Sequence, residues 1–420
     1  MADQYPIRPI ADSEFAAYRA VDEHAFHEGP PGEARLRLLG RLFEADRSLA
    51  AFDPALPASA GPVGIAGAYT FLMSVPGGLL PAAGVTYVAV LPTHRRRGIL
   101  RSLMRRQLAD IAARGEPIAA LWASESPLYG RYGYGRATTQ ASFRFARGEG
   151  ALSAVAPADA ALRLRIAGPA AATAELAKVY ETVLPHQPGF FTRNDAWWER
   201  TLYDPEEDRH GFSPLRCVLA EDGSGPRGYA LYRAKGRWDD DTFLPDSLLD
   251  VHELVAADPA AAAALWRDLL SRDLLTEITA RLRPADDPVL YQLLDPRRAR
   301  PQTHDGLWVR IIDLPAALAR RAYSCPVDLV LEVTDELLPG NAGRWRLRAG
   351  GPDEGARCER TAEAADVRLD VRELGAAYLG GTRLGTLAAA GLVRQSRPGA
   401  LARLSAAMAW DPAPWCPRIF

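Results

Sequence analysis

Residues 86–104 read TYVAVLPTHRRRGILRSLM: an apolar run ends at a proline, and three arginines and a glycine follow it. We expect a strand over residues 85–91 and a helix from about 98 to 113, which Gly115 ends. The first amides of a helix have no partners inside it and carry partial positive charge. Gly98 lets the backbone approach a bulky anion, and arginines add charge and paired phosphate contacts. The stretch therefore predicts a binding site for a nucleotide or coenzyme phosphate.

The basic run Arg95–Arg97 has a plainer alternative, a solvated turn, because most short basic runs are solvated. A Walker loop is excluded because GxxxxGK[ST] is absent, and a dinucleotide motif because no GxGxxG follows a strand. A strand followed by arginines, a glycine and a helix is a rarer order than a basic turn alone. This order favours the phosphate site.

The composition is that of a water-soluble globular protein of more than one domain. The chain has 420 residues, of which 48% are hydrophobic and 24% charged, so disordered, collagen-like and coiled-coil classes are excluded. A net charge of -2 gives no sign of a nucleic-acid partner, and we expect no membrane span and no secretory signal. The cysteines lack CxxC spacing, so we expect no metal site, no disulfides and a cytoplasmic location. They are Cys217, Cys325, Cys358 and Cys416.

Two stretches of biased composition suggest domain boundaries. Residues 149–161 are rich in alanine, glycine and proline, and residues 296–306 read PRRARPQTHDG. We therefore expect domains over residues 1–150, 151–300 and 301–420. Residues 253–270, ELVAADPAAAAALWRDLL, repeat the strand–proline–helix layout of residues 86–104. A hairpin precedes both copies, which favours a duplicated α/β unit over a chance likeness.

At this point the sequence resembles a known family. Arg95-x-x-Gly98-x-Leu100 is similar to the Q/R-x-x-G-x-G/A signature of GCN5-related N-acetyltransferases (GNAT), with Leu100 in place of glycine or alanine. Longer stretches resemble one branch, the Eis ("enhanced intracellular survival") acetyltransferases of actinobacteria. These stretches are GVTYVAVLPTHRRRGILRSLM, IAALWASESPLYGRYGYGRATT, DGLWVRI and YLGGTRLGTLAAAGLV. The resemblance extends over nearly the whole chain and includes its last residue.

The resemblance implies an α/β (α+β) fold with tandem GNAT-like domains followed by a sterol-carrier-protein-like domain. The second copy is degenerate, because Ala260–Ala264 replace the basic turn. We therefore expect one coenzyme site per chain. The resemblance also implies a homohexamer.

The same resemblance implies how acetyl-CoA binds. Backbone groups of Val88, Ala89 and Val90 are expected to pair with the pantetheine arm and polarise the acetyl carbonyl, although an ordinary buried strand is the alternative. Ser124 and Glu125 are expected to line the coenzyme cleft. The pyrophosphate is expected to be held by Arg96, Arg97, Gly98, Ile99, Leu100 and Arg101.

Acetyl transfer to an amine needs a proton donor for the departing thiolate. A phenol with a pKa of about 10 stays protonated at pH 7, so every tyrosine of the LYGRYGYG stretch qualifies. The resemblance selects Tyr129, which we place in a turn after the strand Ile118–Ala123. Tyr132 and Tyr134 are expected to be packing aromatics.

The reaction also needs a base, because an ammonium has no lone pair with which to attack. The resemblance assigns this role to the C-terminal carboxylate, which here belongs to Phe420. An α-carboxylate has a pKa of roughly 3.3–3.7 and is ionised at pH 7. Chain termini are often frayed. The apolar residues Trp415, Ile419 and Phe420 predict instead that this one is docked.

Two residues are expected to bind the acceptor amine. Glu28 follows the first helix, where the resemblance places acceptor-binding loops, and Tyr87 precedes the cofactor strand as an aromatic wall. His24 and His27 lie nearby, but single histidines are more often structural. Asp239–Asp241 are expected to form a solvated loop.

Together these features predict an acetyl-CoA-dependent N-acetyltransferase that acts on amines of aminoglycosides or on lysine-like acceptors. We expect direct transfer in a ternary complex, because no cysteine lies in the motif region to carry the acyl group. The alternative is a non-catalytic sensor or carrier that binds acetyl-CoA or lipid.

Overall fold

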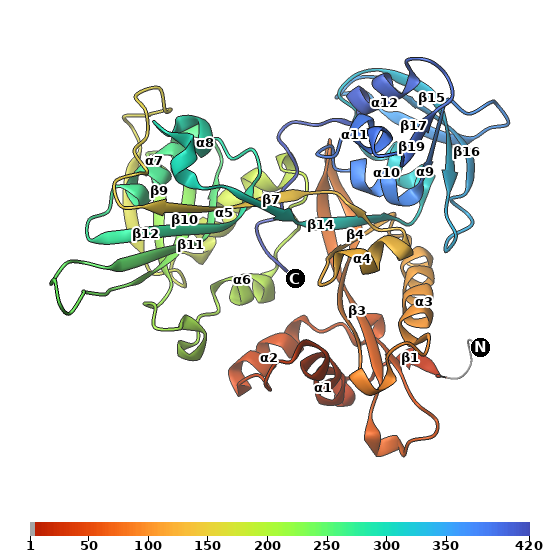
Figure 1. Cartoon of the computed structure of the whole chain (residues 1–420), viewed down its shortest axis with the longest axis horizontal. Coiled ribbons are helices and arrows are strands. Elements are labelled where there is room, and N and C mark those ends of the chain that lie inside the picture. Colours follow the sequence, from red (N-terminus) through yellow and green to blue (C-terminus); the bar gives the residue numbers. More distant parts are fainter. Residues whose placement is uncertain (1–4) are drawn as a thin grey trace. The chain divides into compact units, whose positions relative to one another are not determined.

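The computed structural model describes residues 5–420, which fold into two compact units (Figure 1). The first unit comprises the chain up to Thr138 together with Leu307–Asp411 and Ile419–Phe420. The second unit comprises Thr139–Gly306 and Pro412–Arg418. The chain therefore enters each unit more than once. Within the described residues, no helix combines the length and the apolar character needed to cross a membrane.

The first unit contains a seven-stranded sheet in the order β1-β2-β3-β4-β5-β14-β6. Its strands are β1 (Ile7–Pro9), β2 (Leu49–Ala51), β3 (Gly64–Val75), β4 (Gly78–Val90), β5 (Ile118–Trp122), β6 (Gly135–Arg136) and β14 (Leu307–Ile311). Its helices are α1 (Phe15–Phe26), α2 (Glu33–Leu42), α3 (Ile99–Ala113) and α4 (Ser126–Tyr129). The long β3–β4 hairpin turns at Gly77, whose φ of 88° suits glycine. The predicted helix after Gly98 is α3, and its buried side is formed by Leu103, Met104, Leu108 and Ile111 at helical spacing.

The C-terminal part of the first unit is a five-stranded sheet in the order β17-β16-β15-β18-β19. The strands are β15 (Val327–Thr334), β16 (Gly343–Ala349), β17 (Ala356–Arg360), β18 (Val367–Asp370) and β19 (Val393–Gln395). The helices are α9 (Leu314–Ala319), α10 (Val371–Ala377), α11 (Leu384–Ala389) and α12 (Ala400–Met408). Helix α10 packs tightly on β6 and β14, since a Cβ at Gly135 would lie 1.9 Å from the backbone oxygen of Arg372.

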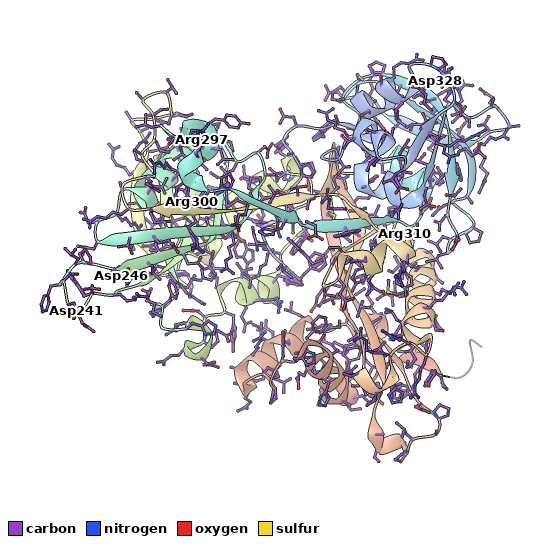
Figure 2. All side chains as sticks on the ribbon, viewed as in Figure 1. Asp241, Asp246, Arg297, Arg300, Arg310 and Asp328 are labelled. Carbon is purple, nitrogen blue, oxygen red and sulfur yellow. The ribbon has the colours of Figure 1, made fainter. Side chains whose placement is uncertain are left out.

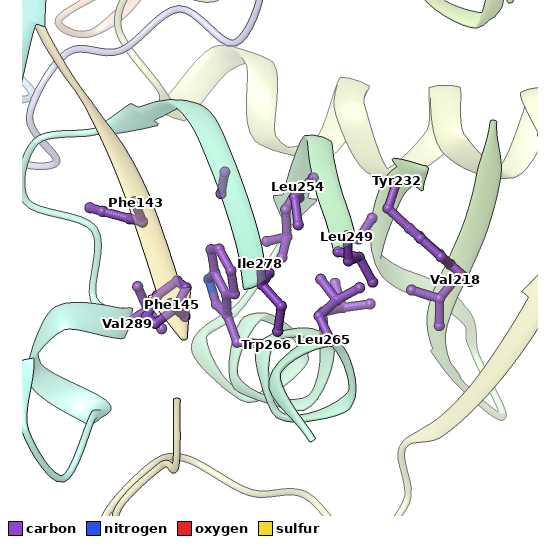
Figure 3. Packing of buried hydrophobic residues seen from close by; sticks show 14 of the residues in the cluster. Phe143, Phe145, Val218, Tyr232, Leu249, Leu254, Leu265, Trp266, Ile278 and Val289 are labelled. Carbon is purple, nitrogen blue, oxygen red and sulfur yellow. The ribbon is translucent and has the colours of Figure 1, made fainter. Parts of the chain in front are cut away.

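The second unit has its own seven-stranded sheet in the order β13-β7-β12-β11-β10-β9-β8. The strands are β7 (Thr139–Ala146), β8 (Arg163–Ala167), β9 (Arg216–Asp222), β10 (Gly225–Lys235), β11 (Ser247–Ala256), β12 (Leu275–Pro284) and β13 (Gln302–Asp305). The helices are α5 (Thr173–Val183), α6 (Asp195–Leu202), α7 (Pro259–Leu270) and α8 (Val289–Gln292). The Asp239–Asp241 loop is exposed, as predicted, and Asp241 lies at the tip of the β10–β11 hairpin (Figure 2). Figure 3 shows Trp266 of α7 beside Phe143 and Phe145 of β7. The ring centroid of Trp266 lies 6.4 Å from that of Phe143 and 6.1 Å from that of Phe145.

Two strands pair differently from the expected division of the chain. Strand β7 falls within the expected first domain but pairs with β12 and β13 of the second unit. Strand β14 falls within the expected third domain but pairs with β5 and β6 of the first unit. Alternation of apolar residues shows which face of a strand is buried, but it does not specify the neighbouring strand. These two crossings therefore had no signal in the local sequence.

Candidate active site

The first sheet opens into a fork between β4 and β5. Their parallel pairing runs from Ala82↔Ile118 to Gly84↔Ala120 and stops there, although β4 continues to Val90. On its other edge β4 stays paired with β3, but the register shifts between Thr86 and Ala89. The shift is a β-bulge, and Tyr87 within it has a left-handed φ of 51°. Beyond Gly84, the edge of β4 that faces β5 has no strand partner among the described residues. Val88, Ala89 and Val90 lie on this unpaired part of the edge.

A turn with two left-handed residues joins β4 to α3. Gly98 is the N-cap of the helix with φ 85°, and Arg96 has φ 63°. The backbone N–H of Ser102 makes the first turn of the helix with the Gly98 oxygen at 3.1 Å. The amides of Ile99, Leu100 and Arg101 come before Ser102 in the chain, so they make no bond of this kind within the helix. They lie at its positive end. A Cβ at Gly98 would meet no atom within 4 Å, so the space beside these amides is open.

Two residues distant in the sequence, Asp53 and Tyr5, hold the turn in place. The buried His94 ring bonds Thr93 Oγ1 through Nδ1 (2.8 Å) and Asp53 Oδ2 through Nε2 (3.1 Å). Arg97 Nη1 donates to the Tyr5 hydroxyl at 3.3 Å. Hydrogen bonds from the Ala55 amide and from His94 lower the pKa of Asp53, so this anchor is charged at neutral pH. His94 stands inside the quoted motif, but these partners lie about 40 and 90 residues away, and the local sequence carries no signal for them.

Tyr129 lies beside the fork as the last residue of α4, not in a turn as predicted. Only 4% of its surface is exposed, and it shares a buried cluster with Ala83 and Val85 of β4 and with α3. Burial raises the pKa of its phenol, and a hydrogen bond with the Ser124 hydroxyl opposes that shift only in part. The phenol is therefore protonated at neutral pH and able to donate. Ser124 and Glu125 are exposed residues between β5 and α4.

The other two tyrosines of the motif are packed. Tyr134 is fully buried, with its ring 6.1 Å from that of Tyr129, and Tyr132 is 8% exposed. Burial raises the pKa of both phenols. Their positions in the same buried cluster agree with the packing role expected for them.

The terminal residue, Phe420, docks on the first unit. It is 7% exposed, and its ring lies 5.2 Å from that of Phe71 on β3, edge to face. A Cβ at Gly84 would lie 3.2 Å from the Phe420 ring and 2.2 Å from the Phe71 ring. Glycine at the last position of β4 that pairs with β5 therefore makes room for the chain's end. Trp415 is buried, as predicted. The prediction that Ile419 is docked was wrong, because Ile419 is 52% exposed and only Phe420, the next residue, is inserted.

Tyr129 and Phe420 belong to opposite faces of β4. Side chains alternate along a strand, and Ala83 and Val85 belong to the cluster that contains Tyr129 and α3. Gly84, between them, faces Phe71 and Phe420. The candidate proton donor and the terminal residue thus flank the strand at the point where the fork opens.

A row of aromatic rings leads from α1 to Phe420. Tyr18 of α1 lies 5.8 Å from Tyr87, which lies 6.3 Å from Tyr69, and Tyr69 lies 5.9 Å from Phe71. The Tyr69 and Tyr87 hydroxyls are 3.3 Å apart. Tyr18, Tyr69 and Phe71 are buried, and Tyr87 is partly exposed, so the row packs against the face of β3 and β4 that carries Phe420 and leaves part of the Tyr87 ring open.

Acidic residues gather at the end of α1. Asp22 makes a buried ion pair with Arg19 at 2.6 Å, and the Arg19 guanidinium lies 5.2 Å from the Tyr87 ring centroid. Burial raises the pKa of Asp22; Arg19 opposes the shift, and Glu28 adds to it through its charge. Glu28 is therefore close enough to act electrostatically on this pair, and it is exposed just after the helix. His24 and His27 are exposed as well.

A forked sheet whose central strand leads through an arginine-rich turn into a helix is the arrangement of the GCN5-related N-acetyltransferases. Models of the acetyltransferase (GNAT) domain match residues 6–137 and 189–311, and a sterol carrier protein domain matches residues 314–417. The predicted order of tandem GNAT-like domains and a sterol-carrier-like domain is thereby confirmed.

Whole-length relatives narrow the class. An uncharacterised N-acetyltransferase of Streptomyces coelicolor is 47% identical over 94% of this chain and 95% of its own. The N-acetyltransferase Eis of Mycobacterium tuberculosis is 38% identical over 88% of each chain. The crystal structure of Eis1 from Mycobacterium abscessus superposes with a TM-score of 0.81 at 34% identity, covering 99% of this chain and 100% of that one. The chain belongs to the Eis-type N-acetyltransferases, and it is an acetyltransferase enzyme.

Proposed function

We propose that this enzyme transfers the acetyl group of acetyl-CoA directly to an amine while both substrates are bound. The observation that carries the proposal is the position of Tyr129 and Phe420 on opposite faces of β4 at the fork. The amine adds to the carbonyl carbon of the thioester, and the thiolate leaves from that same carbon. A base is therefore needed near the attacking nitrogen and an acid near the departing sulfur, at two separate positions. The residues found there can fill both roles.

In the proposed mechanism the chain's groups position the donor and move protons. Backbone groups of Val88, Ala89 and Val90 bind the coenzyme arm along the free edge of β4, and the turn from Arg96 to Arg101 binds its pyrophosphate. Acetyl-CoA supplies the activated acyl group. The Phe420 carboxylate takes a proton from the ammonium, and the new N–C bond forms as the C–S bond breaks. Tyr129 donates its proton to the departing sulfur, and the nitrogen loses its second proton to solvent to give the amide. Solvent then reprotonates Tyr129 and takes the proton from the Phe420 carboxyl, which restores both groups.

The cysteines support direct transfer over a covalent intermediate. Cys217 and Cys416 lie in the second unit, and burial raises the pKa of each thiol to about 12. Cys358 lies on β17, and burial raises the pKa of its thiol to about 12 as well. These thiols are protonated at neutral pH and are poor nucleophiles. Cys325 lies between α9 and β15, outside the buried cluster around Tyr129.

The acceptor class follows from charge and shape. Glu28 and the carboxylate of Phe420 attract cationic amines, and the partly exposed ring of Tyr87 can contact a cation. We propose aminoglycoside amines or lysine-like amines as acceptors.

A change of Glu28 to Gln should raise the KM for a dicationic amine by about fivefold at low ionic strength and leave the KM for acetyl-CoA unchanged. The reason is that one attractive charge is lost at the acceptor side while the coenzyme turn is intact. Glu33→Gln is the matched control, since Glu33 pairs with Arg37 on the exposed face of α2. Steady-state kinetics in each substrate measure the effect. An unchanged amine KM would remove Glu28 from the acceptor site.

A change of Arg96 to Gln should raise the KM for acetyl-CoA by about tenfold with little effect on kcat, because a charged contact to the pyrophosphate is lost. Arg105→Gln is the control, since Arg105 is an exposed arginine further along α3. Titration with acetyl-CoA and with a CoA fragment that lacks the pyrophosphate measures the effect. Equal losses for both ligands, or an equal effect of the control, would contradict a pyrophosphate contact.

The alternative function is a non-catalytic sensor or carrier of acetyl-CoA or lipid. The C-terminal part of the first unit has a groove of about 510 Å³, lined by Arg348, Arg357, Arg403, Asp328 and Glu354 among others (Asp328 is labelled in Figure 2). The other lining residues include Val327, Leu329 and Ala349, so the groove is of mixed character and lacks the wholly apolar lining that suits a sterol or acyl chain. This favours the enzyme over the lipid carrier.

The proposal is tested by release of the CoA thiol from acetyl-CoA with a panel of aminoglycosides, polyamines and lysine peptides. We expect turnover with a subset of amines and initial rates that require both substrates together. Tight acetyl-CoA binding without turnover on any amine would favour the sensor, and parallel double-reciprocal plots would contradict the ternary complex. We further propose that the protein is a cytoplasmic homohexamer. Light scattering of the purified protein measures the molar mass of the assembly and so tests the number of chains.

A further inference from the structure

The second unit repeats the fork of the first. Strand β11 pairs with β12 in parallel from Ser247↔Leu275 to Val251↔Ala280, and both strands then continue apart, to Ala256 and Pro284. The bulge is repeated too, since the register between β10 and β11 shifts between Leu231 and Tyr232. A site equivalent to the coenzyme-binding edge of β4 therefore exists here in outline.

The phosphate end of this second site is closed. The Asp258 carboxylate accepts hydrogen bonds from the amides of Ala260 and Ala261, each at 3.0 Å, at the start of α7. Arg227 pairs with Asp258 at 2.8 Å and holds it there. In the first unit the same helix end begins with Gly98 and carries no side-chain cap. A carboxylate on the amides that would receive a pyrophosphate repels an anion, so this fork does not bind the coenzyme.

The chain's own C-terminal segment occupies the fork instead. The Trp415 indole Nε1 donates to the backbone oxygen of Leu282, on β12 beyond the last residue that pairs with β11. Arg283 lies with its Cζ 4.8 Å from the Trp415 ring centroid and donates to the Leu254 oxygen of β11 at 2.7 Å. Trp415 and Arg283 thus bridge the two strands where they separate.

The loop before α6 clamps the same segment. The Trp415 amide donates to the Pro188 oxygen at 2.8 Å, and Gln187 Nε2 donates to the Ala413 oxygen at 2.7 Å. Gly189 has φ 97°, and a Cβ there would lie 2.5 Å from the backbone oxygen of Trp415. The Trp415 ring packs 5.1 Å from that of Phe190. Only glycine permits this approach, so the loop is built around the segment.

Contacts between the second unit and the C-terminal segment continue almost to the end of the chain. Cys416 is buried, and Arg418 Nη2 donates to the Arg200 oxygen at 2.8 Å, near the C-terminal end of α6. Burial lowers the pKa of Arg418 to about 10, which still leaves it charged at neutral pH. A cation at the negative end of a helix is stabilised by the helix dipole. Residues 412–418 therefore belong to the second unit, and the next two residues belong to the first.

We propose that the second unit is the anchor of the catalytic terminus: its fork, closed to coenzyme, binds Pro412–Arg418 and so positions the carboxylate of Phe420. This rests on the base role proposed for Phe420. If the chain were mobile from Asp411 onward, its end would sample many conformations. The Phe420 carboxylate would then lie near the acceptor amine for only a small fraction of the time. Fixing the residues just before it removes most of that freedom. Trp415, Gly189 and Gln187 therefore act as positioning residues.

The test uses the full-length chain with Gly189→Ala, which displaces the segment without touching the first unit. The control is Gly168→Ala, in the same unit, where a Cβ would meet nothing within 4 Å. Two readouts are compared: the rate at which carboxypeptidase releases Phe420, and kcat with KM for acetyl-CoA. We expect release about tenfold faster and kcat about 10- to 100-fold lower, with the acetyl-CoA KM unchanged. Added acetate should restore part of the lost kcat by supplying a free carboxylate.

Either readout alone can overturn the inference. Release of Phe420 at the wild-type rate means that the segment is not anchored at Gly189, and faster release with unchanged kcat means that the anchor does not position the base. Should Gly189→Ala fail to fold, Gln187→Ala removes one hydrogen bond from the same clamp and should shift both readouts in the same directions by a smaller factor. Full activity of a chain whose terminal carboxylate is blocked would instead contradict the base role itself, whatever the anchoring variants do.

Discussion

A short extension after Phe420 should lower kcat about 10²- to 10⁴-fold at pH 7 while the KM for acetyl-CoA stays unchanged. The extension converts the terminal carboxylate into a neutral amide and moves the charge away from the fork. The base is then lost, and only the small neutral fraction of the amine can attack. Because the Phe420 ring packs beside Gly84 and Phe71, the coenzyme turn at Arg96–Arg101 is not disturbed.

The size of this loss should depend on pH. As pH rises toward the amine pKa of about 10.4, more acceptor is already neutral and a base is needed less. The deficit of the extended chain should therefore narrow with rising pH. Phe420→Leu is the matched control, since it keeps both the carboxylate and an apolar side chain. Thiol release across the pH range measures both variants. Wild-type turnover of the extended chain, or a deficit that is constant with pH, would remove the base role.

The parts of the site that the sequence predicted are those built from neighbouring residues. The strand, the arginine turn and α3 are contiguous, and one run of residues specifies the secondary structure of all three. Tyr129 and Phe420 were selected by family resemblance, not by their local pattern. The left-handed backbone at Arg96 and Tyr87 was not predicted, because neither arginine nor tyrosine favours that conformation.

The rest depends on pairing between distant segments. Strand β14 pairs with β5 in the first sheet, although the two strands lie far apart in the sequence. Strand β7 pairs with strands of the second unit. The sequence predicted that Trp415 is docked, but its partners Pro188 and Leu282 lie far along the chain. A hydrophobic pattern shows that a residue is buried but not which distant residues it contacts. The sequence therefore did not show that the second unit binds the segment before the C-terminus.

A change of Tyr129 to Phe should lower kcat about 10²-fold, with the acetyl-CoA KM within a factor of about two of wild type, because a proton donor to the thiolate is lost and the buried ring is kept. The ring packs with Ala83 and Val85, and phenylalanine preserves those contacts. Tyr132→Phe is the matched control, since it removes a hydroxyl from the same cluster without affecting the proposed donor.

The pH dependence separates a donor from a packing residue. Burial raises the pKa of Tyr129, so the wild-type phenol stays protonated through neutral pH and loses its proton only above the ordinary value of about 10. Wild-type kcat should therefore fall at strongly alkaline pH, while the variant has no phenol to ionise and its deficit should shrink there. A purely structural tyrosine would give a deficit that persists unchanged in that range. An active Tyr129→Phe enzyme at neutral pH would leave the thiolate to depart unaided, and the chemistry at the fork would rest on the Phe420 carboxylate alone.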